Sequence, residues 1–396
     1  MSLPAAVVIS PEAPYPMHGG GALRTASLLH YLAQRYDLDL ILFRQAGDSD
    51  PSLSLPTGLA RNVWTLTLPF HSRRPLAWAV RNGRRWLLGN PPLLNRFSGK
   101  AEEIASLLRG RHYEAGIIEH FWCAPYIEQL APVCERTVLD LHNVESELHG
   151  SCARSDGWPM SVAHGRFARA YIREEMRLFP KFGRLLCASA DDARRVGEMA
   201  PDTPVSVYRN SLPLIPVPQV AEEEELIAFS GNFEYHPNLA AVRFLMKEIW
   251  PRLAKRHPRL RLRLIGKNPR AVARYLESQP RIEITGAIED GVAELAKSQI
   301  AIVPLLSGSG TRLKILEAWA AARPVVSTSI GAAGLEVRAG IDIVLADTVN
   351  AFIASVSELL GSNVRRRQIG CAGRHTYETE YSWESAWRSL ASEGYL

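Results

Sequence analysis

Short apolar runs alternate with longer amphipathic stretches along the whole chain. Each apolar run ends in a turn rich in glycine, proline or polar residues, and a stretch with helical spacing follows. Strands are expected in the first half at 6–10, 38–43, 62–68, 115–119, 137–141, 185–188 and 204–208. Strands are expected in the second half at 226–229, 260–265, 282–284, 300–305, 324–326 and 341–346. This alternation predicts an α/β fold in which helices flank parallel sheets.

Helical spacing fills the intervals between these strands. The expected helices lie over 22–35, from about 124, up to 179, over 190–199, 238–256, 271–278, 291–298 and 350–360, and near 383–390. A chain of 396 residues is too long for one ordinary core. The segment 212–225, LPLIPVPQVAEEEE, has the composition of a stiff linker. We therefore expect a domain over 1–211, this linker, and a second doubly wound domain over 226–378.

The turn that follows the strand 300–305 has the composition of an anion site. It reads SGSGTRLKILE at 307–317, so a glycine-rich turn leads directly into a helix. Free N–H groups and the positive end of the helix dipole would face one point there, supplied by Ser309, Gly310 and Thr311. Arg312 and Lys314 add positive charge beside it. The pattern predicts a phosphate or diphosphate site, with a plain strand-to-helix turn as the alternative.

Polar residues and glycines also follow other predicted strands, at the sheet edge where ligands bind in doubly wound folds. His120 follows the strand 115–119, beside two aromatic residues that improve its prospects of touching a ligand. His142 and Asn143 follow 137–141 and, with Arg24, are assigned to the acceptor side. The remaining strand-end candidates are Gly19, Gly20, Gly21, Asn210, Gly231, Asn232 and Lys267. The alternatives are a flexible glycine turn and structural histidines.

Glu317 lies on the helix that follows the anion turn. Its carboxylate would repel phosphate, but it can accept hydrogen bonds from the hydroxyls of a ribose. A diphosphate at the turn and a ribose at Glu317 together describe a nucleoside diphosphate. The chain has no CxxC, HExxH or GxSxG motif, and no acidic pair is well placed after a strand. We therefore expect no cofactor or metal, with Arg312 and Lys314 stabilising the leaving diphosphate.

The charge of the chain points to an anionic partner. The net charge is +5, and the segment 73–100 carries seven basic residues and no acidic one, with Trp78 and Trp86 between them. A solvated helix is one interpretation, and contact with anionic lipid or a phosphorylated acceptor is another; no nucleic-acid motif accompanies the segment. The chain has no run long enough to span a membrane and no secretory signal. We expect a cytoplasmic protein, with peripheral contact at the inner membrane face through 73–100.

Taken together, these motifs resemble those of GT-B glycosyltransferases, and among them the retaining "group 1" family, family four of the sugar transferases. The resemblance covers nearly the whole chain, and the stretch at 307–327, SGSGTRLKILEAWAAARPVVST with its flanking residue, is its most specific part. The other matching stretches are HGGGALRTASLLHYLAQR, IIEHFW, LLCASADDARRV, YRNSL, FSGNFEYHPNLAAV and LRLIGKNP. The resemblance implies two Rossmann-like domains facing a cleft, with donor bound by the second and acceptor by the first. It also implies a final segment, 379–396, that crosses back to the first domain.

The resemblance assigns roles to single residues. His120 would lie beside the transferred sugar, Glu317 would hold the ribose, and Gly19–Gly21 would approach the donor phosphates or the acceptor. Ser309 stands where relatives often have a sugar-contacting glutamate. The stretch 231–238 lacks the arginine and lysine that relatives use to grip the diphosphate, so Arg312 and Lys314 would replace them. This GTRLK arrangement resembles an exopolysaccharide-type subset of the family.

These expectations define one leading function and two alternatives. The leading hypothesis is retaining, metal-independent transfer of a sugar from a UDP- or GDP-linked donor to a hydroxyl of a glycan, lipid-linked or small-molecule acceptor. A sugar-nucleotide epimerase of the same fold would need acidic residues for proton chemistry, and none is well placed. A non-catalytic binding protein would have no use for a diphosphate turn beside a ribose carboxylate.

Overall fold

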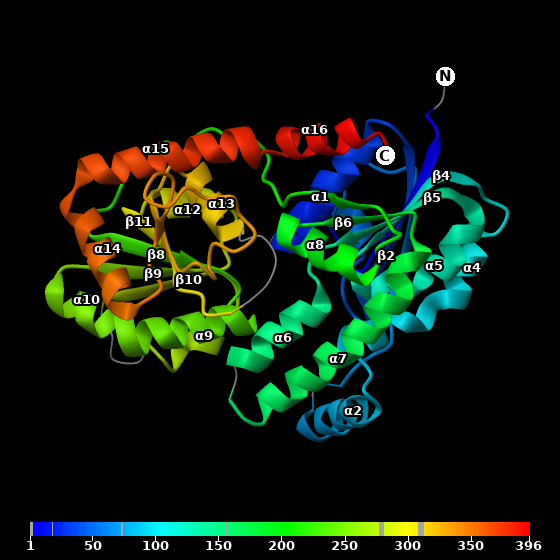
Figure 1. Cartoon of the computed structure of the whole chain (residues 1–396), viewed down its shortest axis with the longest axis horizontal. Coiled ribbons are helices and arrows are strands. Elements are labelled where there is room, and N and C mark those ends of the chain that lie inside the picture. Colours follow the sequence, from blue (N-terminus) through cyan, green and yellow to red (C-terminus); the bar gives the residue numbers. More distant parts are fainter. Residues whose placement is uncertain (1–2, 18, 73, 156, 277–280, 308–312) are drawn as a thin grey trace. The chain divides into compact units, whose positions relative to one another are not determined.

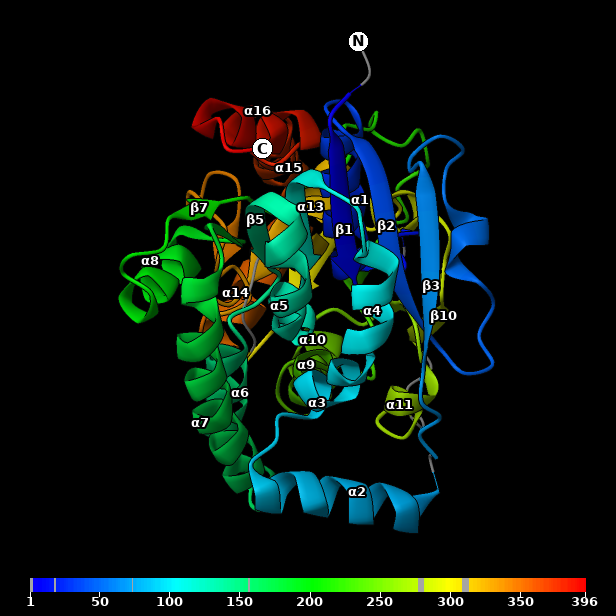
Figure 2. The ribbon, with the colours of Figure 1, turned by 90° about the vertical axis from the view of Figure 1, so that its right-hand side faces the viewer.

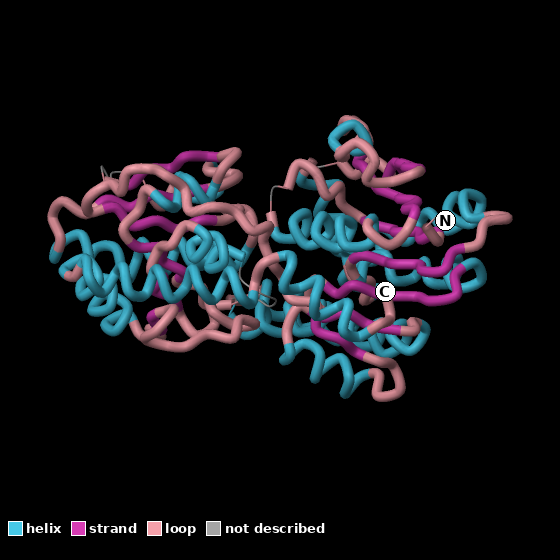
Figure 3. Tube along the Cα trace, turned by 90° about the horizontal axis from the view of Figure 1, so that it is seen from above, coloured by secondary structure: helices cyan, strands magenta, loops and turns pink. Residues whose placement is uncertain are grey.

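The computed structural model describes residues 3–17, 19–72, 74–155, 157–276, 281–307 and 313–396. Two compact units make up the chain (Figure 1). One consists of residues 1–209 together with 387–396, and the other of residues 210–386. Each unit has its own parallel sheet flanked by helices, as Figure 3 shows by colour. The predicted α/β class is confirmed.

The first unit is built on a seven-stranded sheet in the order β3-β2-β1-β4-β5-β6-β7. All of its strand pairs are parallel. The strands are β1 (Ala5–Ser10), β2 (Asp37–Gln45), β3 (Asn62–Leu68), β4 (Tyr113–Glu119), β5 (Cys134–Leu141), β6 (Arg184–Cys187) and β7 (Val205–Val207). The inner strands are almost wholly buried because they are covered on both faces, which explains their continuous apolar runs.

Helices cover both faces of this sheet. In Figures 1 and 2, α4 and α5 lie on one face and α1 on the other. The helices are α1 (Gly20–Ala33), α2 (Pro75–Leu88), α3 (Pro92–Phe97), α4 (Ala101–Leu108), α5 (Ile127–Leu130), α6 (Glu145–Ser155), α7 (Met160–Leu178) and α8 (Ala190–Met199). Arg166 on α7 donates to the backbone oxygens of Trp86 and Leu87, which fixes α2 at the edge of this unit (Figure 2).

The second unit repeats the plan with a six-stranded sheet, in the order β10-β9-β8-β11-β12-β13. Its strands are β8 (Leu226–Ser230), β9 (Arg261–Ile265), β10 (Ile282–Gly286), β11 (Ile300–Val303), β12 (Val325–Ser327) and β13 (Val344–Leu345). Its helices are α9 (His236–Phe244), α10 (Trp250–Arg256), α11 (Arg270–Ala273), α12 (Gly291–Ala296), α13 (Leu313–Ala320), α14 (Val349–Gly361) and α15 (Asn363–Glu380). A π-helical turn over Leu245–Ile249 joins α9 to α10. Both halves thus carry a doubly wound sheet, as the alternating pattern predicts.

The helix α15 is not among the expected elements. Its sequence, NVRRRQIGCAGRHTYETE, contains two glycines, which usually weaken a helix. The structure gives the reason for both. A Cβ on Gly370 would lie 2.4 Å from the backbone oxygen of Ala322, and one on Gly373 would lie 2.3 Å from the indole of Trp319. The glycines therefore allow α15 to pack closely against α13 and the turn after it.

The segment expected as a linker is held by the second unit. Tyr377 on α15 donates to the oxygen of Pro213 at 2.6 Å, and Arg374 donates to that of Ile215 at 2.6 Å. The acidic run that follows is paired rather than free in solvent. Its ion pairs join Glu222 to Arg323, Glu223 to Arg261 and Arg263, and Glu225 to Arg259. Composition indicated a linker because these basic partners lie far away in the sequence.

The last helix, α16 (Trp383–Glu393), begins in the second unit and ends in the first. Its C-terminal half is anchored to the first unit by polar contacts. The indole N–H of Trp387 donates to the oxygen of Ser27 at 3.1 Å, and Glu393 pairs with Arg184 at 2.6 Å. The hydroxyl of Tyr31 donates to the oxygen of Leu396 at 3.0 Å. These contacts explain why residues from 387 onward belong to the first unit.

Among the helices of the described residues, none is both long enough and apolar enough to cross a bilayer.

Candidate functional site

Each sheet contains one point where the strand order reverses. In the first unit this switch point lies between β1 and β4, and in the second between β8 and β11. Loops that leave neighbouring strands there run to opposite faces of the sheet, so a crevice forms outside the strand ends. The glycine loop and His120 follow β1 and β4, while Ser230 and the anion turn follow β8 and β11. Sequence reasoning therefore placed its main candidates at the two switch points.

The glycine loop leads into α1. Gly19 has φ 118°, a conformation that L side chains rarely adopt, and Gly20 is the first residue of the helix. A Cβ on Gly21 would lie 3.0 Å from Glu12 Oε2, 3.5 Å from His120 Nε2 and 3.6 Å from a ring nitrogen of His142. The absent side chain at Gly21 thus leaves three polar atoms grouped around one point.

His120 is strained, buried and stacked. Its backbone has φ 62° at the end of β4, and its N–H donates to the oxygen of Asp140 at 2.9 Å. The ring lies between those of Trp122, at 4.3 Å, and His142, at 3.5 Å. Burial and the charge of His142 lower the pKa of His120. Its Nε2 is buried without a hydrogen-bond partner among the described residues, so a neutral imidazole is left able to meet a ligand.

A network of buried charges lies directly beneath His120. The guanidinium of Arg24 forms two bonds to Asp140, with Nε to Oδ2 at 2.8 Å, and a third to the oxygen of Tyr208. His142 Nε2 lies 2.6 Å from Glu119 and 3.4 Å from Asp140. Arg24 is only 1% exposed, which gives it a role inside the core. Its assigned contact with an acceptor stays a prediction.

The charges of this network determine its protonation states. Burial disfavours charge throughout, yet hydrogen bonds to Asp140 and Glu119 outweigh burial and raise the pKa of His142 to about 9. Arg24 and His142 hold the pKa of Asp140 below its usual range. Burial and the charge of Asp140 raise the pKa of Glu119. His142 is therefore an imidazolium at neutral pH and His120 an uncharged ring.

The raised pKa of His142 predicts a pH-dependent stability. A group whose pKa is higher in the folded state than its unfolded value of about 6.5 stabilises the fold below that value. The contribution is lost as the pH rises through about 9. Urea unfolding of wild type and His142→Gln should show a difference in unfolding free energy that shrinks from pH 6.5 to pH 9. A difference that stays constant over this window would contradict the assignment.

Glu119, Asp140 and His142 also form the one group of potential metal ligands that the described residues provide, with their ligand atoms within 4.8 Å of one another. The donor set does not suit a cation. Asp140 already binds the guanidinium of Arg24, and the shared nitrogen of His142 bonds to both carboxylates. These internal cations fill the place that a metal ion would take, so we assign the group to the core.

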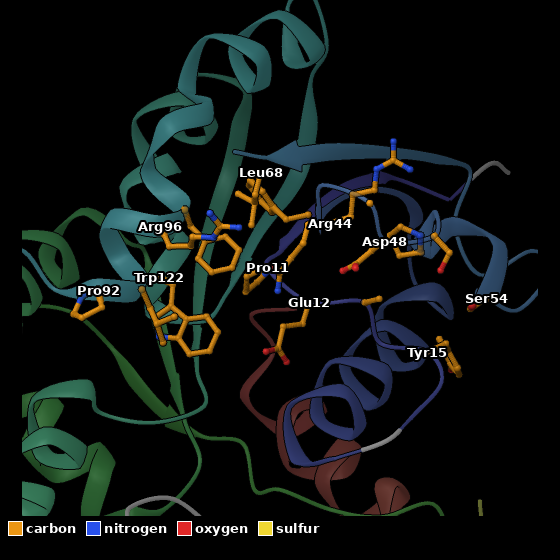
Figure 4. Close-up of a pocket in the computed structure, with 18 of the residues that line it drawn as sticks. Pro11, Glu12, Tyr15, Arg44, Asp48, Ser54, Leu68, Pro92, Arg96 and Trp122 are labelled. Atoms are coloured by element: carbon orange, nitrogen blue, oxygen red, sulfur yellow. The ribbon is translucent and has the colours of Figure 1, made fainter. Parts of the chain in front are cut away.

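A pocket of about 850 Å³ opens beside the glycine loop, at the strand ends of the first unit (Figure 4). Glu12 lies at its centre; Arg96 and Trp122 line one side, and Asp48 lies on the opposite side. The indole N–H of Trp122 donates to Glu145 at 2.9 Å. Burial raises the pKa of Glu145 to about 8, the Trp122 bond opposing the shift. The pocket therefore combines carboxylates, arginine and aromatic faces, the surfaces that bind sugars and phosphates.

In the second unit, two glycines bring the loops after β8 and β9 together. A Cβ on Gly266, which has φ 144°, would lie 1.9 Å from the oxygen of Gly231. The N–H of Gly231 donates to the oxygen of Ile265 at 2.8 Å. No larger residue fits at Gly266, so the motifs SGN and IGK must occur together. Lys267 follows this contact, and its oxygen accepts from Phe233 at 3.1 Å.

Lys314 is held at the switch point of the second unit. Its Nζ donates to Asn238 Oδ1 at 2.9 Å and lies 5.5 Å above the ring of Phe229. Asn238 in turn donates to the backbone oxygen of Asn232 at 2.8 Å. The side-chain oxygen of Asn232 accepts from Asn268 at 2.9 Å. Only neutral groups hold Lys314 in these contacts, so the ammonium keeps its full charge for an anion.

Glu317 lies one helical turn beyond Lys314 and close to the end of β8. Ser230 donates to its carboxylate at 3.4 Å. Burial raises the pKa of Glu317, and the charge of Lys314 opposes this shift. A carboxylate with one long, weak bond retains acceptor capacity for further hydroxyls.

Other predicted site residues are placed less fully. Ser309, Gly310, Thr311 and Arg312 lie outside the described residues, so their donor contacts stay predictions. Ser307, which precedes them, is 1% exposed, and its hydroxyl has no hydrogen-bond partner in the described part of the chain. Asn143 follows His142 at the end of β5, and Asn210 is 8% exposed at the first position of the second unit.

Several residues of the site were not found from the sequence. Glu119 and Asp140 are single acidic residues near the ends of apolar strands, and that position was a signal for a buried charge network. Asn238 and Ser230 act through contacts with residues far along the chain, which no local pattern shows. Glu12 gave no signal at all, since it lies in a proline-rich loop.

Comparison with known proteins identifies similar sequences and folds. A family model described as "Glycosyl transferases group 1" matches residues 224–362. An uncharacterized 44.6 kDa protein in the cps region of Klebsiella pneumoniae is 22% identical over 368 residues, covering 86% of this chain and 87% of that protein.

The solved structures that resemble the chain cover nearly all of it. Sucrose-phosphate synthase from Thermosynechococcus elongatus has a TM-score of 0.74 at 14% identity, over 98% of both chains. TarM has a TM-score of 0.73 at 11% identity, over 99% of both chains. HepE from Anabaena, solved with UDP, has a TM-score of 0.68 at 10% identity, over 98% of this chain and 99% of that one.

Proposed function

We propose that this chain, which has the GT-B fold and carries a group 1 glycosyltransferase domain, moves a sugar from a nucleotide-diphosphate donor to an acceptor hydroxyl. We further propose that the transfer retains the anomeric configuration and uses no metal ion. The observation that carries this proposal is the constellation of Lys314, Glu317 and Ser230 beside the anion turn. A cation and a hydroxyl acceptor, one helical turn apart, suit a diphosphate and its adjoining ribose.

The donor base is proposed from similar structures. HepE has been solved with UDP and with UDP-glucose. These structures support a uridine donor for this chain, with guanosine as the alternative to be tested beside it. The sugar follows from neither the fold nor the described side chains.

The proposed chemistry gives each group one task. The bond between the sugar's anomeric carbon and the diphosphate oxygen breaks, and the acceptor oxygen forms a bond to that carbon on the same face. The acceptor proton passes to the departing diphosphate oxygen. Lys314 stabilises the negative charge that builds up there, and Glu317 orients the nucleotide through its ribose. His120, neutral and with an unpartnered Nε2, would contact the sugar or the acceptor.

Replacing Glu317 tests the ribose contact. Glu317→Ala should weaken UDP binding by roughly 10- to 100-fold, because it removes hydrogen bonds to a charged acceptor. Calorimetric titration with UDP and with 2′-deoxy-UDP provides the control. Wild type should prefer UDP, and the variant should bind the two nucleotides equally. A variant that still prefers UDP would show that another group recognises the ribose.

The acceptor is proposed to bind the first unit, in the pocket beside Glu12 and Trp122. TarM has been solved with UDP and α-GlcNAc-glycerol, so one protein of this fold does meet a glycosylated product. Contact between 73–100 and a membrane stays a prediction from composition, as does a cytoplasmic location. The exposed apolar residues of α2, among them Leu76 and Leu87, are compatible with such contact.

A further inference from the structure

Four basic side chains gather where α2 and α3 meet the loop after β3. Arg81 and Arg85 lie one turn apart on α2, Arg96 lies on α3, and His71 precedes α2. All four are half-buried. We call this group the cation cluster. Like charges brought together in a partly buried place repel one another, so a cluster of this kind costs stability unless an anion joins it.

Neutral oxygens hold the cluster in place. Arg81 donates to the backbone oxygen of Ser72 at 3.1 Å, and Arg85 donates to the side chain of Asn95 at 3.0 Å. Arg96 donates to the backbone oxygen of Pro69 at 2.7 Å. Within the described part of the chain, no ion pair joins these arginines to a carboxylate. These contacts orient the guanidinium groups without neutralising them.

The mutual repulsion is visible in the titration of the cluster. Burial, followed by the charges of Arg81 and Arg96, lowers the pKa of Arg85. Burial and Arg81 lower the pKa of Arg96, and burial and the three arginines lower that of His71. The Nε of Arg81 is buried and has no hydrogen-bond partner among the described residues. The cluster thus has both unused donors and unbalanced charge.

The cluster borders the acceptor pocket. Arg85 and Arg96 line that pocket, and Figure 4 shows Arg96 next to Trp122. Arg85 also lines a second pocket of about 710 Å³, together with His71 and Arg81. This second pocket has apolar walls from Leu76, Val80 and Leu88 of α2. An anionic group at the cluster would therefore lie between a polar pocket that suits a sugar and an apolar one.

We propose that the cation cluster binds a phosphate or diphosphate group of the acceptor, so that the acceptor is a phosphorylated glycan carrier rather than a neutral sugar. The proposal rests on the proposed function, since it names the acceptor of that transfer. Arginine suits the task because its planar guanidinium binds phosphate through two parallel hydrogen bonds. The apolar pocket beyond the cluster accommodates a hydrocarbon attached to the phosphate.

The test uses the whole chain with its donor site filled. Protein saturated with UDP is titrated calorimetrically with inorganic pyrophosphate at fixed ionic strength. Wild type should bind it, and the double variant Arg85→Gln, Arg96→Gln should bind roughly 10- to 100-fold more weakly, since it loses two charged donors. Arg109→Gln, an exposed arginine at the end of α4, is the matched control and should bind as wild type. A double Arg→Lys variant should retain part of the binding, which distinguishes lost charge from lost folding.

Each arm separates one explanation. Equal pyrophosphate binding by wild type and the Gln double variant would overturn the proposal. Binding to phosphatidylglycerol vesicles but not to pyrophosphate would also overturn it, because the cluster would then serve a lipid surface instead of an acceptor group. UDP binding is measured first on every variant. Its loss in wild type would contradict the proposed function, whereas its retention in the Gln double variant confines the effect to the acceptor.

Discussion

Lys314→Ala should lower kcat by roughly 100- to 1,000-fold, the cost of removing one preorganised donor from a developing anion. Lys314 is fixed by Asn238 at 2.9 Å and lies over the ring of Phe229. Its charge is therefore in position before the diphosphate leaves, and no other described residue of the second unit is assigned this task. Nucleotide binding should weaken as well, because the ground-state diphosphate is already an anion. Steady-state release of UDP from the donor measures the first effect and calorimetry the second.

A matched control separates chemistry from a general loss of charge. Lys247, in the π-helical turn, is 83% exposed and pairs only with its neighbour Glu248 in the described contacts. Lys247→Ala should leave kcat and UDP affinity unchanged. Asn238→Ala should give a smaller loss than Lys314→Ala, since it frees the ammonium without removing it. Unchanged turnover and binding in Lys314→Ala would rule out Lys314 as the donor cation.

Arg24→Ala should destabilise the first unit by about 3–5 kcal/mol, which is the usual cost of leaving a buried carboxylate without its partner. Asp140 would lose two guanidinium bonds, and Glu119 would lose a nearby positive charge. The backbone oxygen of Tyr208 would lose its bond to Arg24. Equilibrium urea unfolding, followed by tryptophan fluorescence, measures the change.

The control for this change is an arginine on the surface. Arg194 is 61% exposed and pairs with Glu198 at 3.0 Å, so Arg194→Ala should cost less than about 1 kcal/mol. Asp140→Asn should restore part of the stability lost in Arg24→Ala, because it removes the carboxylate left unpaired. If Arg24→Ala cost no more than Arg194→Ala, the charges of the network would not be coupled in the way described.

The fold was predictable because its signals are local. Continuous apolar strands and intervening helical patterns are read within short windows, and both sheets appear where they were expected. The close glycine contact of Gly266 with Gly231 was also indicated by sequence, as two glycines that each follow a strand. The helix α15 was missed because its glycines serve packing against Ala322 and Trp319, which are distant in sequence.

The site was predictable only in part, for a related reason. Positions directly after strands identified His120, His142 and Glu317, since topology alone brings strand ends together. The partners that set their charge states could not be read in the same way. Asp140 and Glu119 raise the pKa of His142 through contacts that span 23 residues or less of sequence but depend on strand pairing. The cation cluster shows the same limit: composition located it in 73–100, while the structure shows which arginines meet.

The central claim is that the second unit binds a nucleoside diphosphate sugar without help from a metal ion. Thermal unfolding in EDTA, with UDP, GDP, ADP, TDP and their sugars at equal concentration, tests it most directly, because a ligand that binds the folded state raises Tm. We predict that UDP and a UDP-sugar raise the Tm of wild type, and raise it less in Lys314→Ala and Glu317→Ala. An unchanged Tm with every nucleotide, or a shift that appears only after a divalent metal is added, would contradict the account.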